Sequence, residues 1–152
     1  MPNSEQGSAI KTRKASCRCG KLSVTYAGPD PERITVCHCN SCQLRTGTVF
    51  SVQARFPRAM AKIEGKSTKW AVPRDTEAQA CDSGGATYHF CPACGSTVYW
   101  DISTAPDVIG VAIGTLTDAK FPPPKISGFE SYGHPWAMKP ADLPIQRLKL
   151  AE

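Results

Sequence analysis

Seven of the eight cysteines in the sequence stand in close groups of a kind that binds metal ions. The groups are C-x-C (Cys17, Cys19), C-x-C-x-x-C (Cys37, Cys39, Cys42) and C-x-x-C (Cys91, Cys94). Zinc binds thiolates at the corners of a tetrahedron, and two cysteines a few positions apart can supply two adjacent corners. The residue types and their spacing therefore indicate metal chemistry.

The same cysteines fit a disulfide framework poorly. The chain has 152 residues, which is longer than most small disulfide scaffolds, and its first residues contain no apolar stretch typical of a secretory leader. Cysteines two positions apart, such as Cys17 and Cys19, are badly placed to bridge each other but well placed to hold one ion. We therefore expect metal binding in a reducing compartment, the cytoplasm.

The two outer pairs are expected to share one structural zinc ion. Cys91 and Cys94 belong to the sequence CPACG, in which proline and glycine favour a tight turn around an ion. Cys17 and Cys19 would lie on one face of an extended segment, because side chains alternate along a strand. A site made of Cys17, Cys19, Cys91 and Cys94 would close all four corners and staple distant parts of the chain.

The middle group then has three cysteines for a second zinc ion, and two interpretations stay open. Catalytic zinc sites typically have three protein ligands and one open corner, which would suit Cys37, Cys39 and Cys42. Alternatively, Cys81 fills the fourth corner and the site is structural. His38, His89 and His134 are expected to be hydrogen-bonded or solvated, although His38 could act as an acid or base beside the metal.

The sequence between the cysteines predicts a single, mainly β domain. Short runs rich in β-branched and aromatic residues, each bounded by turn residues, predict strands at 22–28, 48–56, 68–72, 86–90, 96–100 and 108–114. Only a turn or two of helix is expected, near 40–46. Residues 1–14 are expected to be a flexible basic tail, residues 15–137 the zinc-binding domain, and residues 138–152 a C-terminal extension.

Composition narrows the range of partners. Hydrophobic residues make up 41% of the chain, as in an ordinary globular protein, and no run of 18 apolar residues predicts a membrane span. The net charge of +5 includes the run KTRK at 11–14, which we interpret as a solvated tail rather than a nucleic-acid-binding arm. We expect a small-molecule partner, with no membrane and no nucleic acid.

The order of the cysteine groups, together with their surroundings, resembles the family of glutathione-dependent formaldehyde-activating enzymes, which includes the centromere protein V group. The resemblance covers residues 15 to 137. It rests on the segments SCRCGKLSVTY, VCHCNSCQLRTGTVFSV and YHFCPACGSTVYW, followed by VIGVAIGTLTD and GHPW.

This resemblance implies a β-tent of antiparallel sheets, stapled by zinc, with two zinc ions per chain. It implies a structural zinc on Cys17, Cys19, Cys91 and Cys94 and a catalytic zinc on Cys37, Cys39 and Cys42. Cys81 does not match a ligand of the family, so the fourth corner of the second site would be left for the sulfur of a substrate.

The implied activity is that of a carbon–sulfur lyase, an S-(hydroxymethyl)glutathione synthase-like enzyme. A zinc-bound thiol such as glutathione ionises readily, and its sulfur could attack formaldehyde. Arg45 and Arg55 are candidates to line a groove for the carboxylates of glutathione. The competing interpretation is a two-zinc module that binds protein or nucleic acid without catalysis.

Overall fold

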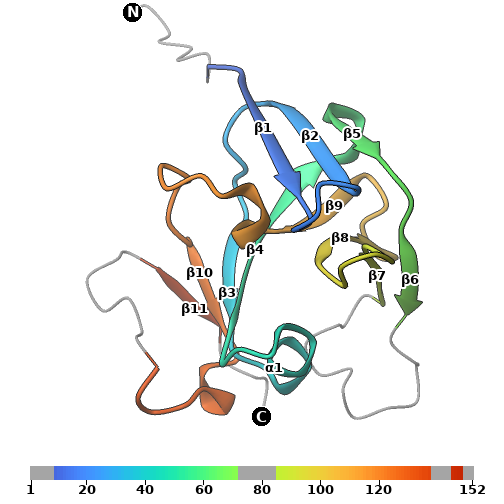
Figure 1. Ribbon diagram of the computed structural model, residues 1–152. Helices are drawn as coiled ribbons and strands as arrows, with labels where there is room; N and C mark the ends of the chain where they lie inside the picture. The colour runs from blue at the N-terminus through green and yellow to red at the C-terminus, as the bar shows by residue number, and fades with distance from the viewer. Residues whose placement is uncertain (1–8, 72–84, 138–144, 149–152) are drawn as a thin grey trace, which may run out of the picture.

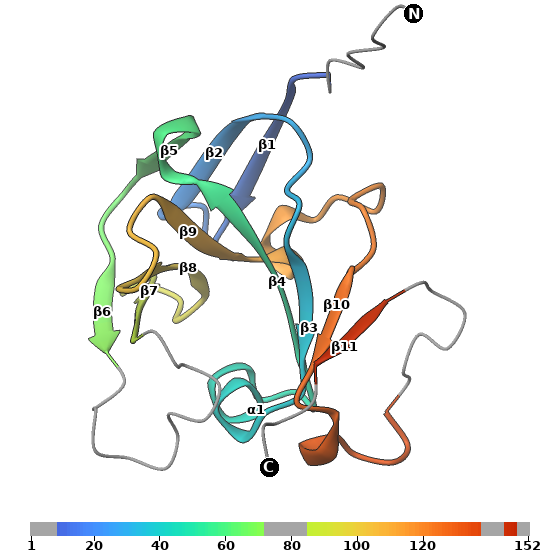
Figure 2. The ribbon, with the colours of Figure 1, turned by 180° about the vertical axis from the view of Figure 1, so that it is seen from behind.

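The computed structural model describes residues 9–71, 85–137 and 145–148, and it consists mainly of β-strands arranged in two sheets (Figures 1 and 2). Cys81 lies outside the described residues. Within the described part of the chain, no helix is long and apolar enough to cross a membrane.

The smaller sheet is antiparallel and has the strand order β1-β2-β5. Its strands are β1 (Lys11–Ser16), β2 (Ser23–Gly28) and β5 (Ala61–Glu64). Pairing of Ser16 with Ser23 at the end of β1 leaves only six residues for the turn that follows, 17–22. This turn contains the first two cysteines, so the sheet fixes where they lie.

The larger sheet has the strand order β11-β10-β3-β4-β9-β8-β7-β6. In chain order its strands are β3 (Ile34–Cys37), β4 (Ser51–Pro57), β6 (Thr68–Ala71), β7 (Ala86–Phe90), β8 (Thr97–Ile102), β9 (Val108–Ala112), β10 (Ile126–Gly128) and β11 (Gln146–Leu148). Most neighbours are antiparallel, but β10 pairs in parallel with both β3 and β11.

The main hydrophobic core combines residues of both sheets. Leu22, Val24 and Tyr26 of the smaller sheet and its turn join Phe56, Val98 and Ile109 of the larger sheet among its fully or almost fully buried members. Burying apolar side chains from two sheets against each other is the main stabilising contribution in such a fold. Cys17 and Cys91 also belong to this core, which fixes the backbone around them.

The only α-helix among the described residues, α1 (Asn40–Thr46), follows β3 directly. It begins where the Cys39 sulfur accepts a hydrogen bond from the Cys42 backbone N–H, at 3.3 Å. It ends at Gly47, whose φ of 67° is left-handed and whose N–H binds the Gln43 carbonyl. In Figures 1 and 2, α1 lies at the lower end of the molecule, away from the smaller sheet.

The expectation of a mainly β fold is confirmed, and each of the six runs predicted to form strands overlaps one. The short strands β1, β3, β5, β10 and β11 were not predicted. The run KTRK is not a solvated tail throughout, because Lys11–Ser16 form β1 and Arg13 is buried, where its guanidinium pairs with Asp30. The division into tail, domain and extension remains a prediction.

Candidate metal centres

The first cluster unites the two outer cysteine pairs, as predicted. The sulfur atoms of Cys17, Cys19, Cys91 and Cys94 all lie within 4.8 Å of one another. Cys19 Sγ lies 3.6 Å from both Cys17 Sγ and Cys91 Sγ. Four sulfurs placed about 2.3 Å from a zinc ion at the corners of a tetrahedron would be roughly 3.8 Å apart. The first cluster therefore fits a tetrahedral ion of this size.

Two tight turns, one from each sheet, build the first cluster. After β1 ends, the Cys17 carbonyl accepts a hydrogen bond from the Gly20 N–H at 3.0 Å. After β7 ends, the Cys91 carbonyl accepts one from the Gly95 N–H at 2.8 Å, and Gly95 has a left-handed φ of 73°. The expectation that Cys17 and Cys19 lie on one extended face was wrong, because the chain turns there.

Donors next to the first cluster already point at its sulfurs. The Leu22 backbone N–H donates to Cys17 Sγ at 3.2 Å. Hydrogen bonds from the side chain and backbone of Ser96 lower the pKa of the Cys94 thiol to about 5. For Cys19, the Lys21 backbone lowers the pKa, but burial and the neighbouring thiols outweigh it and raise the pKa to about 11. Several thiolates this close together need a cation between them.

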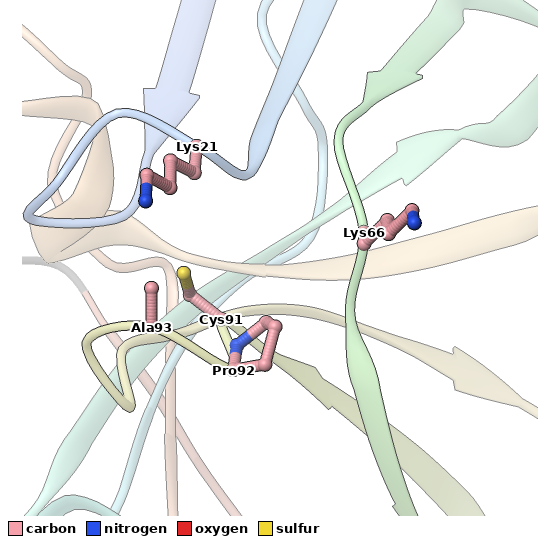
Figure 3. Close-up of a pocket in the computed structure, with 5 residues that line it drawn as sticks. All are labelled: Lys21, Lys66, Cys91, Pro92 and Ala93. Carbon is pink, nitrogen blue, oxygen red and sulfur yellow. The ribbon is translucent and has the colours of Figure 1, made fainter.

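A cavity of about 450 Å³ lies beside the first cluster, lined by Lys21, Lys66, Cys91, Pro92 and Ala93. Figure 3 shows the Cys91 sulfur on the same side of the CPAC turn as the Lys21 side chain, while Lys66 extends away from the sulfur. A four-thiolate zinc site carries a net charge of about −2, so nearby lysines would favour it electrostatically.

The second cluster consists of the middle cysteines, as predicted. The sulfurs of Cys37, Cys39 and Cys42 lie within 4.8 Å of one another, and all three residues are buried. Cys37 is the last residue of β3, Cys39 caps the N-terminus of α1, and Cys42 lies in the first turn of α1. The junction of strand and helix thus brings three thiols together within six residues of chain.

Residues from the C-terminal part of the chain support the second cluster. Phe129 packs against the three cysteines and has a left-handed φ of 59°, which is rare for a residue other than glycine. The Gln43 amide donates to the His38 carbonyl at 2.8 Å and to the Tyr132 carbonyl at 3.1 Å. Neither Phe129 nor Gln43 was predicted from the sequence to support the cysteines, because no local motif signals either contact.

Cys37 and Cys42 are free thiols. A cysteine ligates metal as a thiolate, so the free thiol is the form that can join the ligand set. Whether Cys81 closes this site is not tested, because Cys81 lies outside the described residues.

The histidines are hydrogen-bonded or buried rather than grouped with the cysteines. His89 Nδ1 shares a hydrogen bond with Ser67 Oγ and its Nε2 with Asp101 Oδ2, both at 2.8 Å. His134 Nε2 lies 3.3 Å from Gln43 Oε1. Gln43 follows Cys42 directly on α1, so His134 lies close to the second cluster although it is distant from it in sequence. His38 is fully buried, with its ring centroid 6.0 Å from that of Phe50.

The two candidate arginines have different surroundings. Arg45 lies on α1, one turn from Cys42, and its Nη2 donates to Ser51 Oγ at 2.7 Å. Arg55 lies on β4, whose register places Ser51 opposite Cys37. Four residues of strand span about 13 Å, so Arg55 is well removed from the second cluster. Burial and the charge of Arg33 lower the pKa of Arg55. Of these two candidates, Arg45 is the one that lies near the second cluster.

The family model for "glutathione-dependent formaldehyde-activating enzyme" matches residues 12–132. Among solved structures, the chain is similar to a Rhodobacter sphaeroides protein solved as a structural-genomics target, with 18% identity and a TM-score of 0.47. That match covers 70% of this chain and 90% of the other. No curated protein matches the chain.

Proposed function

Because the chain belongs to the family of glutathione-dependent formaldehyde-activating enzymes, we propose that it is a zinc-dependent carbon–sulfur lyase of the cytoplasm. It would form or cleave the S-hydroxymethyl adduct of glutathione or of a related thiol. The observation that carries this proposal is the presence of two separate cysteine clusters, one of four sulfurs and one of three. The two clusters would do different work.

The first cluster would be a structural zinc site. Its four sulfurs lie close enough together to supply the corners of a tetrahedron, and its members come from a turn of the smaller sheet and a turn of the larger one. Structural zinc supplies folding free energy directly, because the site does not exist in the unfolded chain. No corner would remain for a substrate.

The second cluster would be the reactive site, held by reduced Cys37, Cys39 and Cys42. Zinc bound there would supply a positive charge that favours the thiolate form of a substrate thiol. The chain provides three thiolates on a short, rigid segment, and Phe129 and Gln43 hold that segment against the region 128–134. Burial of the three sulfurs keeps water away from the reacting atoms.

The reaction is then a simple addition. The thiolate sulfur of the substrate attacks the carbonyl carbon of formaldehyde and forms a carbon–sulfur bond. The π electrons of the carbonyl pass to its oxygen. That oxygen takes up one proton to give the S-hydroxymethyl product. In the reverse direction the hydroxyl loses its proton, the carbon–sulfur bond breaks, and thiolate and formaldehyde separate. Holding both reactants together would lower the entropic part of the barrier.

Exchange spectroscopy by NMR tests this proposal. Glutathione and ¹³C-formaldehyde equilibrate without help, and the exchange rate between free and adduct carbon is measurable. The reduced, zinc-loaded protein should raise that rate in proportion to its concentration, and Cys42→Ser should abolish the increase. A rate that the protein does not change would contradict the proposed activity.

The competing possibility, a binding module without catalysis, has less support. Lys11 and Arg13, two of the four residues of the basic run KTRK, pair with Asp30. A module that binds nucleic acid should be retained on heparin in a strongly salt-dependent way. We expect weak retention that is lost at moderate salt.

A further inference from the structure

A second cavity, of about 310 Å³, lies beside α1 and is distinct from the cavity at the first cluster. We call it the aromatic pocket, and it is lined by Ser41, Leu44, Arg45, Trp70, Tyr88, Phe90 and Thr97. Three of its lining residues are aromatic. Its size is near the lower end of the range for small-molecule sites, which is about 300–1,000 Å³. It therefore suits one flat group rather than a whole tripeptide.

The aromatic rings form an ordered wall. The rings of Trp70 and Tyr88 are stacked, with centroids 6.3 Å apart and planes inclined by 17°. Trp70 and Leu44, which both line the aromatic pocket, are 52% and 83% exposed. Exposed apolar surface that borders a cavity commonly marks a binding site. A flat apolar group would cover this surface and stack on the rings.

Arg45 adds a positive charge to this wall. Its guanidinium lies 5.0 Å from the ring centroid of Tyr88 and 4.9 Å from that of Trp100. Its Nε is buried and has no hydrogen-bond partner among the described residues. None of the ion pairs within the described ranges includes Arg45. Among the residues that the structure describes, this charge therefore has no acidic partner, and a guanidinium matches the geometry of a carboxylate through two parallel hydrogen bonds.

The aromatic pocket also adjoins the second cluster. Arg45 and Cys42 are three residues apart on α1, so their Cβ atoms are about 5–6 Å from each other. Arg45 also donates to Ser51, which pairs with Cys37 between β3 and β4. A substrate whose sulfur is held by the second cluster could therefore extend past Arg45 into the aromatic pocket.

We propose that the aromatic pocket binds a flat apolar group bearing a carboxylate, and that this group belongs to the substrate that reacts at the second cluster. This inference rests on the proposed lyase function and names its substrate class: thiols, or their adducts, with an aromatic or similarly flat acidic substituent. Glutathione alone would leave the aromatic wall uncovered.

Calorimetric titration of the zinc-loaded protein with benzoate and with benzamide tests the pocket itself. The two probes have the same shape, but only benzoate is charged, and neither contains sulfur. We expect benzoate to bind at least about fivefold more tightly than benzamide. Arg45→Met should remove this difference, Arg45→Lys should restore part of it, and Trp70→Ala should weaken both probes. Trp136→Ala, which changes an exposed tryptophan that does not line the pocket, is the matched control.

Equal binding of the two probes, or binding that neither pocket variant changes, would overturn the proposal. Thermal unfolding of each variant separates a lost site from a lost fold. Titration with 4-mercaptobenzoate then tests the link to the second cluster. It should bind more tightly than benzoate, and Cys42→Ser should remove the gain. If 4-mercaptobenzoate binds the unchanged protein no more tightly than benzoate does, the link between the aromatic pocket and the second cluster is refuted. If the unchanged protein binds 4-mercaptobenzoate but not glutathione, that result counts against the proposed lyase function alone.

Discussion

Replacing one cysteine in each cluster should separate folding from substrate binding. Cys94→Ser weakens the first cluster, in which Cys19 and Cys91 are 72 positions apart in the chain. Cys42→Ser weakens the second cluster, whose outermost cysteines, Cys37 and Cys42, are five positions apart. Each variant removes one sulfur from a candidate metal site, so the two form a matched pair. They differ in the length of the loop that metal binding would close between the cysteines.

The expected magnitudes follow from the entropy of closing these loops in the unfolded chain. A cross-link that closes a loop of about 73 residues stabilises the fold by about 4.4 kcal/mol, and one that closes about 6 residues by about 2.2 kcal/mol. These values are upper limits, because three thiolates remain in the first cluster of Cys94→Ser. For a chain of this size they correspond to losses of melting temperature of about 9–18 °C and about 4–9 °C.

Thermal unfolding followed by circular dichroism, with zinc content measured by mass spectrometry, checks this prediction. Cys94→Ser should lose roughly twice as much stability as Cys42→Ser and should keep the zinc of the second cluster while it is folded. Equal losses of stability in the two variants, or a larger loss in Cys42→Ser, would refute the division between a structural and a reactive cluster.

Four further predictions concern single residues. The hydrogen bond from Lys11, together with the pairing to Arg13, lowers the pKa of Asp30. The Asp30 carboxylate therefore stabilises the fold fully above about pH 4, the usual pKa of an unfolded aspartate, and this contribution is lost as the pH falls further. Asp30→Asn should reduce the acid dependence of the melting temperature and lower the free energy of unfolding by about 1 kcal/mol at pH 7. A Cβ at Gly110 would lie 2.1 Å from the Trp100 ring, so Gly110→Ala should cost about 1–3 kcal/mol and change the near-ultraviolet circular dichroism of the tryptophans. Gln43→Ala removes two hydrogen bonds next to the second cluster and should lower the zinc content of that cluster but not of the first. Metal analysis of Gln43→Ala beside Cys94→Ser, which weakens the first cluster instead, checks this. Cys81→Ala should leave two zinc ions per chain, and loss of one ion would support the closed second site instead.

The fold was predictable where the sequence carries strong local signals. Runs such as STVYW and VIGVAIG have β-branched and aromatic residues between turn residues, and each overlaps a strand. The strand β3 (Ile34–Cys37) is fully buried and has four residues, too few to show a period of two. The parallel pairing of β10 with β3 joins segments more than 90 residues apart, so no local pattern could predict it.

The cysteines of both sites were predictable because ligand spacing is a short-range property. Their grouping in space agrees with the structure at all seven positions. The surroundings of the sites were not predictable in the same way. Phe129 and Tyr88 reach their partners through sheet topology, and the pairing of Arg45 with the Tyr88 and Trp100 rings depends on strands β7 and β8. Turn geometry at Cys17 and Cys19 was also mistaken, since C-x-C fits an extended segment and a turn equally well.

The central claim is that the second cluster accepts a thiol, and a calorimetric titration of glutathione into the reduced, zinc-loaded protein tests it most directly. We expect saturable binding with one site per chain that disappears in Cys42→Ser, while Cys42→Ser retains the zinc of the first cluster. Binding of equal strength in Cys42→Ser, or no binding to a protein shown to hold two zinc ions, would contradict the claim.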